Sequence, residues 1–497
     1  MKNLCKIIFL CLILSINAEA QTVTWQKWYD YDNLEDNGQD VIQTFDGGYA
    51  ILSNSYTNPN PKTEVFKTDQ FGNVEWRKLY DVNNVGGNSL NCRSIAQTKD
   101  SSFIISGRNK DSAIIFKINQ IGNIIWIKRY SKLGRFAGFW DHNLTFNNGI
   151  IGCGYLYDPS IGYVVKTDSI GNIEWDSVYN YTTTVIRIIE SSDGSFYMLG
   201  INTSEKISDW NKMYYPTSNI IQKNHSKNFP FYSNGIETAT LIKINNIGKI
   251  IWKLNMFLPN ATDLINHPSG NIFVSGGHDS LILYKIDTTG AVLFQKSYYR
   301  GVVGCFSMCL SQDGNILLGS VLEAHMAASK IEPNGKLIFN KQISSINNTE
   351  FAFLPYAVNP TNDSGFIFTG FTNYPPNLLE SNTYASKTDS LCSAPLIVSI
   401  SKNDVLLPVD FILYQNYPNP FNPNTRIKYN IYKAGFVNLK VFDLKGIEIC
   451  SLINKVQQPG NYDVQFNSIK YYLSSGLFYC KLSVQNKSSI IKLILLK

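Results

Sequence analysis

The residues best suited to chemistry in this sequence are histidines and carboxylates that lie close together along the chain. Four of the five histidines are candidates: His142, His225, His278 and His325. Three of these four have an acidic residue nearby, which is Asp141, Asp279 or Glu323. They show no His-x-x-x-His pair or other spacing that would place two ligands on one face of an element, as zinc sites require. We therefore predict no metal and no cofactor, and we expect these histidines in surface loops.

Catalytic motifs give no stronger signal. The chain contains no Gly-x-Ser-x-Gly, no phosphate-binding loop and no zinc-protease pattern, so we predict no catalytic residue. Glycoside hydrolysis needs only two carboxylates about 5 to 10 Å apart, which spacing along a sequence does not exclude. A secreted glycoside hydrolase or polysaccharide lyase therefore stays open as the alternative to a binding protein.

Aromatic residues concentrate in one long segment, from Ile201 to Gly235, among Asn and Ser. Aromatic rings with adaptable polar neighbours suit stacking on sugars or gripping a partner chain, but they also suit packing on one another to fasten a long loop. Phe139 and Trp140 allow the same two interpretations. The candidate ligand-binding residues are Trp140, Trp210, Tyr214, Tyr215, Phe231 and Tyr232.

A repeated hairpin must supply the scaffold that positions these side chains. In the stretch from Lys166 to Tyr179, Asp168 begins a type I turn and Gly171 takes its fourth position in a left-handed conformation. Trp175 then lies on the returning strand. The glycine of this hairpin recurs at Gly72, Gly122, Gly171, Gly248, Gly290 and Gly335.

A second signature precedes each hairpin: a turn of Asp, Gly, Ser or Asn followed by a short apolar strand. It occurs seven times, beginning at residues 46, 100, 147, 193, 268, 313 and 363. The seventh copy starts a hairpin at Ser386 but has no outgoing Trp strand. The segment from Trp25 to Tyr29 has the Trp-to-Tyr spacing of that missing strand.

This arrangement predicts an all-β fold: a seven-bladed β-propeller of four-stranded blades over residues 21–397, whose N-terminal strand closes the last blade. An open array of β-repeats is the alternative. Both repeated turns fall on one face of such a propeller. The long segments fall on the other face, which we expect to carry function: residues 30–38, 81–89, 131–141, 201–235 and 344–354.

The hairpin resembles the tryptophan-docking repeat of quinoprotein-type propellers, and also WD-like ones, because Trp follows the turn glycine by four residues. Quinoprotein dehydrogenases place an adjacent Cys pair against their cofactor, and this sequence has no such pair. The resemblance therefore implies a fold and no quinone.

The chain changes character after a linker at residues 398–411. Residues 412–497 carry an Asn-Tyr-Pro-Asn-Pro-Phe-Asn-Pro run, three turn glycines and a basic end. The motif residues are Asn416, Pro418, Asn419, Pro420, Phe421, Asn422, Pro423, Gly446, Gly460, Gly476, Lys492 and Lys497. This pattern strongly resembles the type A C-terminal sorting domain of the type IX (Por) secretion system. Ile447 and the pair Tyr432-Lys433 are small departures from it.

Short alternating strands with Gly and Pro turns predict an Ig-like β-sandwich here. The resemblance implies a cargo address that the type IX secretion machinery reads and its sortase removes, releasing the protein or attaching it to the cell surface. An ordinary accessory domain is the alternative.

The N-terminus fits export. Lys2 and Lys6 precede an apolar run and Ala18-Glu19-Ala20, which predicts a signal peptide over residues 1–20, cleaved after Ala20. No later segment reaches about 18 apolar residues, so we expect no transmembrane segment in the mature chain. The formal net charge of +6 is scattered, which argues against nucleic acid. Of the seven cysteines that remain, Cys153 and Cys309 are predicted core residues.

The sequence as a whole predicts a secreted or cell-surface protein that passes through the periplasm. We expect a non-enzymatic module that binds an extracellular glycan or protein, or alternatively a carbohydrate-active propeller enzyme or a purely structural surface protein.

Overall fold

The computed structural model describes most of the chain. The described residues are 23–29, 35–57, 60–80, 90–202, 238–277, 280–300, 302–322, 325–343, 353–372, 381–394, 411–413, 416, 418–431, 433–443, 446–485 and 487–496. Two compact units divide the chain, Met1–Ile397 and Val398–Lys497, and we describe each by itself.

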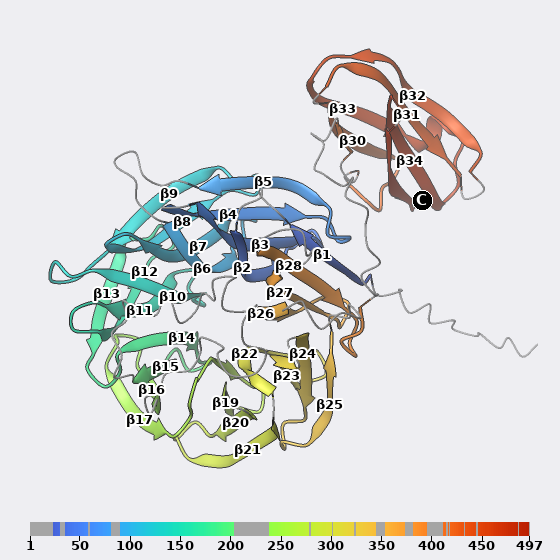
Figure 1. Cartoon of the computed structure of the whole chain (residues 1–497). Helices are drawn as coiled ribbons and strands as arrows, with labels where there is room; N and C mark the ends of the chain where they lie inside the picture. Colours follow the sequence, from blue (N-terminus) through green and yellow to red (C-terminus); the bar gives the residue numbers. More distant parts are fainter. Residues whose placement is uncertain are drawn as a thin grey trace, which may run out of the picture. The chain divides into compact units, whose positions relative to one another are not determined.

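Unit 1 is a propeller-like all-β structure, and its described residues form seven four-stranded antiparallel sheets arranged around a centre (Figure 1). The first two sheets hold β2 (Glu35–Gln43), β3 (Tyr49–Thr57), β4 (Asn60–Thr68) and β5 (Val74–Tyr80), then β6 (Leu90–Gln97), β7 (Phe103–Asn109), β8 (Ser112–Ile118) and β9 (Ile124–Tyr130). The third and fourth hold β10 (Ala137–Leu144), β11 (Ile150–Leu156), β12 (Ile161–Thr167) and β13 (Ile173–Tyr179), then β14 (Thr184–Glu190), β15 (Phe196–Asn202), β16 (Thr238–Ile244) and β17 (Ile250–Met256).

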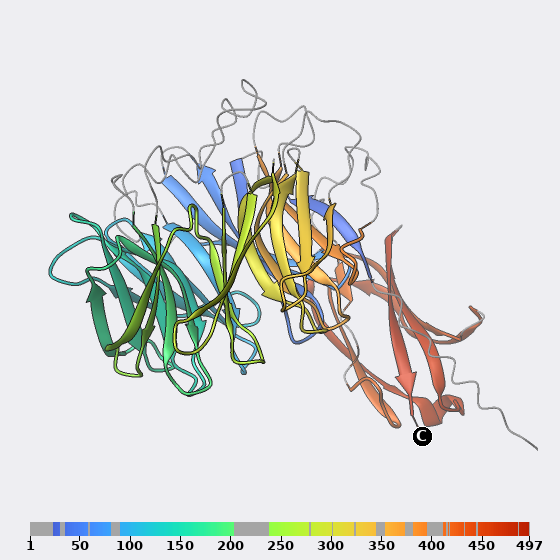
Figure 2. The same ribbon diagram turned by 90° about the horizontal axis from the view of Figure 1, so that it is seen from below.

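The remaining three sheets follow the same order. The fifth and sixth hold β18 (Asp263–Asn266), β19 (Ile272–Gly276), β20 (Ser280–Ile286) and β21 (Val292–Arg300), then β22 (Val302–Leu310), β23 (Ile316–Leu322), β24 (His325–Ile331) and β25 (Leu337–Gln342). The seventh holds β26 (Phe353–Pro360), β27 (Phe366–Thr372), β28 (Asn382–Thr388) and β1 (Trp25–Tyr29). Figure 2 shows the sheets from the side, with their strands running between two faces.

Strand β1 comes from the start of the chain but completes the seventh sheet. It pairs antiparallel with β28, and Trp25 lies opposite Lys387. Trp76 has the same partner position opposite Lys67, and Trp175 lies opposite Lys166. This is the pairing that the Trp-to-Tyr spacing predicts.

The turn chemistry follows the prediction closely. Gly171 has a φ of 82°, and its N–H donates to the Asp168 carbonyl at 3.2 Å. One carboxylate oxygen of Asp168 accepts the backbone N–H groups of Ile170 and Asn172 at 3.0 and 2.9 Å. At the seventh copy Cys392 takes the glycine position with a φ of 55°. Turn geometry therefore explains the repeated Asp and Gly without a ligand.

The repeated aromatic residues join each sheet to the next. Trp175 Nε1 donates to the Asn246 carbonyl at 2.8 Å, and Tyr179 Oη donates to the Gly248 carbonyl at 2.8 Å. Both carbonyls belong to the turn of the following sheet. A Cβ at Gly248 would lie 3.0 Å from the Trp175 ring, so the glycine also makes room for the indole. Trp25 makes the same contact with the Gly72 turn of the first sheet, since its Nε1 donates to the Gln70 carbonyl at 3.0 Å.

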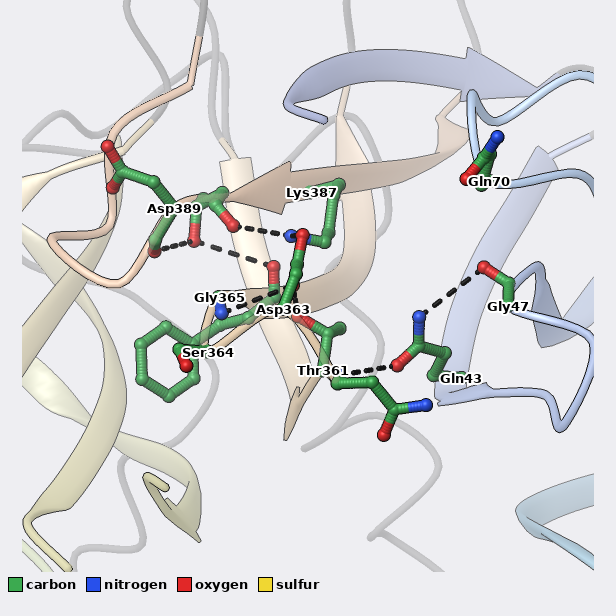
Figure 3. A network of polar contacts seen from close by, with 12 residues as sticks. Gln43, Gly47, Gln70, Thr361, Asp363, Ser364, Gly365, Lys387 and Asp389 are labelled. Carbon is green, nitrogen blue, oxygen red and sulfur yellow. Dashed lines mark hydrogen bonds and ion pairs between the residues drawn. The ribbon is translucent and has the colours of Figure 1, made fainter. Parts of the chain in front are cut away.

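The repeated lysine is a structural cation. Lys387 is 1% exposed and pairs with Asp363, in the second-signature turn, at 2.9 Å (Figure 3). Lys67 and Lys243 pair in the same way with Asp46 and Asp193 at 2.9 and 2.8 Å. A buried ammonium is costly unless it is paired, and this need explains why Lys and Asp recur together.

The core of unit 1 lies between neighbouring sheets. Strands β11, β24, β27 and β28 are buried along their whole length, because a sheet covered on both faces needs side chains that avoid water on both sides. Cys153 and Cys309 are buried among apolar residues, as predicted. The cysteines of the described residues are all unpaired thiols.

Unit 2 contains two antiparallel sheets that pack around one apolar cluster. The first holds β29 (Phe411–Leu413), β30 (Asn424–Ile431) and β33 (Gly460–Asn467); the second holds β31 (Gly435–Phe442), β32 (Glu448–Gln457), β34 (Gly476–Val484) and β35 (Lys487–Leu495), and a 3₁₀ turn, η2 (Ser468–Tyr471), follows β33. Strand β30 alternates buried and exposed residues along its length. That alternation is typical of a sheet with one covered face.

Four loop expectations were wrong in their bounds. The predicted segment 201–235 includes the last two residues of β15, and the segment 344–354 includes the first two residues of β26. The predicted long segment 131–141 includes the first five residues of β10, and the segment 30–38 includes the start of β2. The first strands of the sheets continue further than hydrophobic alternation indicates, because a bulge interrupts the period of two.

Candidate functional site

One edge strand of each sheet lies nearest the centre of unit 1 (Figure 1). We call these seven strands the inner strands: β2, β6, β10, β14, β18, β22 and β26. Neighbouring inner strands lie beside one another, and β26 lies beside β2. Inner strands offer side chains from several sheets to one central region.

Six inner strands carry a β-bulge at the same place. The residue that each bulge leaves without a partner on the neighbouring strand belongs to a group that we call the bulge set: Gln39, Arg93, Trp140, Ile186, Phe306 and Tyr356. A bulge breaks the alternation of the strand and redirects a side chain. The bulge set is therefore the feature that most resembles a built site.

Contacts within the bulge set join a cation to aromatic rings. The Arg93 guanidinium donates to Gln39 Oε1 at 2.9 Å, and its Cζ lies 4.8 Å from the centre of the Trp140 ring. The Phe306 and Tyr356 rings meet edge to face, with centroids 6.4 Å apart. Arg93, Trp140, Phe306 and Tyr356 are each half-buried. Such a surface suits stacking and hydrogen bonding with a ligand.

The residues next in sequence bridge the inner strands. Asp40 accepts the Ile95 N–H at 2.9 Å, Asp263 accepts the Met308 N–H at 2.7 Å, and Ser307 Oγ accepts the Val358 N–H at 3.3 Å. Asp141 accepts the Ile188 N–H at 3.4 Å. Each bond connects one inner strand to the inner strand of the following sheet. These side chains satisfy backbone donors beside the bulges.

Two inner strands, β14 and β26, have no acceptor side chain directly after the bulge-set residue, because Arg187 and Ala357 occupy that position. The following aspartate then caps its own strand: Asp263 accepts the Leu264 N–H at 2.8 Å, and Asp40 accepts the Val41 N–H at 2.8 Å. Both carboxylate oxygens of Asp40 and Asp263 are thus engaged by protein donors. This use is structural.

Arg187 holds the acidic residues together electrostatically. Its Nε lies 3.0 Å from Asp263 Oδ1. Burial raises the pKa of Asp40 to about 7 and the pKa of Asp141 to about 6, and the positive charge of Arg187 limits both increases. These perturbed pKa values are the one feature of the site that acid–base catalysis would also show.

His142 is not in a surface loop, contrary to the prediction. It lies within β10 and is 3% exposed, and its Nδ1 is 2.8 Å from Ser106 Oγ. Burial lowers its pKa to about 3, so the ring is neutral. His325 is also buried, at the start of β24, whereas His225 and His278 lie outside the described residues. The described part of the chain contains no cluster of three or more His, Cys, Asp or Glu suited to a metal.

The structure describes one of the six predicted binding residues. Trp140 belongs to the bulge set, and Phe139 beside it is buried in the core, with its ring 5.8 Å from Tyr130. The other five fall outside the described residues: Trp210, Tyr214, Tyr215, Phe231 and Tyr232. Sequence reasoning missed the rest of the bulge set. The sequence did contain a signal for them. Each residue of the bulge set lies seven positions before the first residue of its second-signature turn.

The sorting-motif residues tie the start of unit 2 to its last strand. Asn419 Nδ2 donates to the Lys492 carbonyl at 3.2 Å, and the Ile494 N–H donates to Asn419 Oδ1 at 2.8 Å. Phe421 is 2% exposed and exchanges backbone bonds with Ile494 and Leu496 at 2.9 and 3.0 Å. Asn416 Nδ2 donates to Thr425 Oγ1 at 2.8 Å.

The other motif positions are turns or strand ends. Gly446 has a φ of 79° in the Asp443 turn, Gly460 begins β33, and Gly476 begins β34. Pro418, Pro420 and Asn422 are exposed, Pro423 is half-buried, and Lys497 lies outside the described residues. The motif thus has a local structural role in unit 2.

These observations define a propeller-like all-β protein with an aromatic and cationic centre. No family model matches the chain, and no curated protein matches it. Solved structures similar to it include one titled "Structure of Dos1 propeller", with 10% identity over 72% of this chain and 79% of that one and a TM-score of 0.44. Others are a luciferin-regenerating enzyme, with 8% identity over 59% and 90% and a TM-score of 0.37, and a protein from Lactobacillus plantarum, with 11% identity over 70% and 96% and a TM-score of 0.41. We draw nothing about activity from these likenesses.

Proposed function

We propose that the chain is a non-enzymatic binding protein of the cell exterior, and that the bulge set contacts its glycan or protein ligand. One observation carries this proposal: aromatic and guanidinium groups meet at the centre, while both oxygens of Asp40 and Asp263 are already used by backbone donors. A general acid or base must reach its substrate, and these carboxylates bridge strands instead.

The binding proposal is tested with polysaccharides and candidate proteins immobilised on a surface. Trp140→Ala should reduce retention of the bound ligand by about tenfold, because aromatic stacking and the cation–π contact are lost together. Phe45→Ala is the matched control, since Phe45 is 65% exposed in a turn outside the bulge set. An equal loss of ligand retention in Trp140→Ala and Phe45→Ala would contradict the proposal that the bulge set contacts the ligand.

A carbohydrate-active enzyme is the second candidate, and the raised pKa values of Asp40 and Asp141 favour it. The same polysaccharide screen separates the two ideas when new reducing ends are measured beside retention. Cleavage at catalytic rates that disappears in Asp141→Asn would replace the binding proposal. Retention without cleavage supports binding.

We infer that unit 1 is a closed seven-bladed propeller and unit 2 an Ig-like sandwich of the type A sorting class. The pairing of β1 with β28 and the neighbouring positions of β26 and β2 support closure. The two packed antiparallel sheets of unit 2 and its motif residues support the second assignment.

Export is part of the same proposal. Residues 1–20 would direct the chain to the periplasm, and residues 412–497 would present it to the type IX machinery and its sortase. Within the described residues, no helix has the length and apolar character needed to cross a membrane. A chain truncated before Phe411 should accumulate in the periplasm of a host with this secretion system, as measured by cell fractionation. Normal surface delivery of that truncated chain would refute the assignment.

A further inference from the structure

A pocket of about 360 Å³ opens at one end of the fourth sheet. Its walls come from the end of β15, the start of β16, the end of β17 and the two connections that flank this sheet. Asn202, Lys253, Asn255 and Phe257 line it together with Tyr181.

The apolar part of the pocket is unusually open to water. Phe257 is 67% exposed and Tyr181 is 50% exposed, while Met256, which also lines the pocket, is 3% exposed. Exposed aromatic rings beside a hollow are a common mark of a ligand site, because a ligand ring covers them and gains stacking energy. The rings alone would suit any sugar.

The polar part of the pocket is held in place by hydrogen bonds. Asn202 Nδ2 donates to Thr240 Oγ1 at 3.2 Å, and Thr240 Oγ1 donates to Asn255 Oδ1 at 3.2 Å. This chain uses the donor of Asn202 and the acceptor of Asn255. Among the described residues, the carbonyl oxygen of Asn202 and the amide N–H groups of Asn255 have no hydrogen-bond partner, and such a mixed pair suits sugar hydroxyls.

The charge of the pocket is positive. Lys253 Nζ lies 3.5 Å from the centre of the Tyr181 ring, and no carboxylate of the described residues forms an ion pair with it. The cation–π contact orients the ammonium without neutralising it. A neutral sugar would leave this charge unused, whereas a carboxylate or sulfate group would pair with it.

We propose that this pocket binds an acidic sugar of a polysaccharide, with its ring against Phe257 and its carboxylate or sulfate at Lys253. The site is distinct from the bulge set and does not depend on it. An experiment that contradicts binding at the pocket therefore does not contradict binding at the bulge set, and the reverse also holds.

The test uses the full-length protein, the neutral polysaccharide dextran, dextran sulfate with the same backbone, and polygalacturonate. We expect binding to an acidic polysaccharide at least about tenfold tighter than to dextran, measured by affinity electrophoresis and calorimetry. Tighter binding to dextran sulfate would identify the acidic group as a sulfate, and tighter binding to polygalacturonate would identify it as a carboxylate. Phe257→Ala and Lys253→Gln should each weaken that binding by about tenfold, and Lys253→Arg should retain it.

Phe146→Ala is the matched control, because Phe146 is 69% exposed in a turn far from this pocket along the chain. It should bind like the unaltered protein. All substituted side chains are exposed, so thermal unfolding should be unchanged in each variant. Equal binding of dextran would overturn the proposal, because the acidic group would then contribute nothing. Binding to the acidic polymers that falls with salt but not with Phe257→Ala and Lys253→Gln would overturn it in favour of a diffuse effect of the net positive charge.

Discussion

Asp40 is the residue whose protonation should control the stability of unit 1 most strongly. Its two carboxylate oxygens accept the N–H groups of Ile95 and Val41, in two different sheets. Burial raises its pKa to about 7, against an ordinary value near 3.8, and the charges facing it are Arg187 and Asp141. The folded state therefore holds a proton that the unfolded state has released over this range.

Linkage then gives the direction of the pH effect. A folded protein that binds more protons than its unfolded chain loses stability as pH rises, so unit 1 should become less stable from about pH 4 to about pH 7. Urea unfolding at pH 5 and pH 8 should show the larger free energy of unfolding at pH 5. In Asp40→Asn the difference should shrink to the part that Asp141 contributes. An unchanged difference would contradict this account.

Two glycines separate the effect of backbone strain from that of packing. Gly171 and Gly194 have φ values of 82° and 75°, but a Cβ at Gly171 would lie 2.8 Å from Lys128 Cγ, and one at Gly194 would meet nothing within 4 Å. Each alanine variant should lose about 1 kcal/mol from strain, and Gly171→Ala should lose about 1 kcal/mol more from the contact. Denaturant unfolding of both variants measures the difference, and equal losses would count against close packing of Lys128 on Gly171.

The residues whose roles could be predicted from the sequence are those fixed by local turn geometry and strand pairing. Asp168, Gly171 and Trp175 have positions that turn geometry and strand pairing dictate, so their roles were readable from spacing. His142 was misplaced because burial depends on the neighbouring sheet, which no local pattern encodes.

Elements of the same repeat differ where their partners differ. Trp25, Trp76, Trp175 and Trp252 each donate to a carbonyl of the next turn, but Phe294 and Phe339 stand at this position in the fifth and sixth sheets. Cys392 replaces glycine in the turn that follows, and Phe339 packs against the apolar cluster that contains it. We infer that the smaller ring of Phe339 leaves room for the larger side chain of Cys392 in this turn.

This complementarity predicts a coupled pair of substitutions. Phe339→Trp should destabilise unit 1 by about 1 to 3 kcal/mol, because the indole needs the space that the Cys392 side chain fills. Adding Cys392→Gly should restore most of the loss, since glycine makes room and suits the positive φ. A double-mutant cycle by urea unfolding should give a coupling energy of at least about 1 kcal/mol, and simple additivity would contradict the packing account.

Strand existence was predictable from alternation and turn residues, whereas strand length was not. The inner strands contain bulges that shift the alternation by one residue, so β10 extends into what the pattern indicates is a loop. The bulge set was missed for the same reason. Only comparison of the copies with one another, at a fixed offset from the turn, would have revealed it.

At the scale of the molecule, the first strand of the chain should matter to all of unit 1. A protein that begins after Tyr29 leaves β28 with an unpaired edge and removes the Trp25 contact with the Gly72 turn. We expect a lower melting temperature and concentration-dependent aggregation, because open strand edges pair with other chains. A protein that begins at Gln21 is the control, and light scattering with thermal unfolding compares the two. Equal melting temperatures would mean that β1 contributes little.

The order of the sheets in unit 1 was the most predictable level, because a counted repeat leaves few architectures open. Seven second signatures and one displaced Trp strand indicated the number of sheets and the partner of β1. The site was predictable only at Trp140, since ligand contacts depend on which side chains several sheets bring together.

The pairing of β1 with β28 also sets the order in which the protein reaches its final state. Gln26 and Tyr384 are hydrogen-bonded although they lie 358 positions apart in the sequence. Closing so long a loop is entropically costly and slow, so this step should come last, after the other sheets have formed. When the chain leaves a ribosome or a membrane pore from its N-terminus, β1 emerges first. It therefore stays unpaired until β28, the last strand of unit 1, has also emerged.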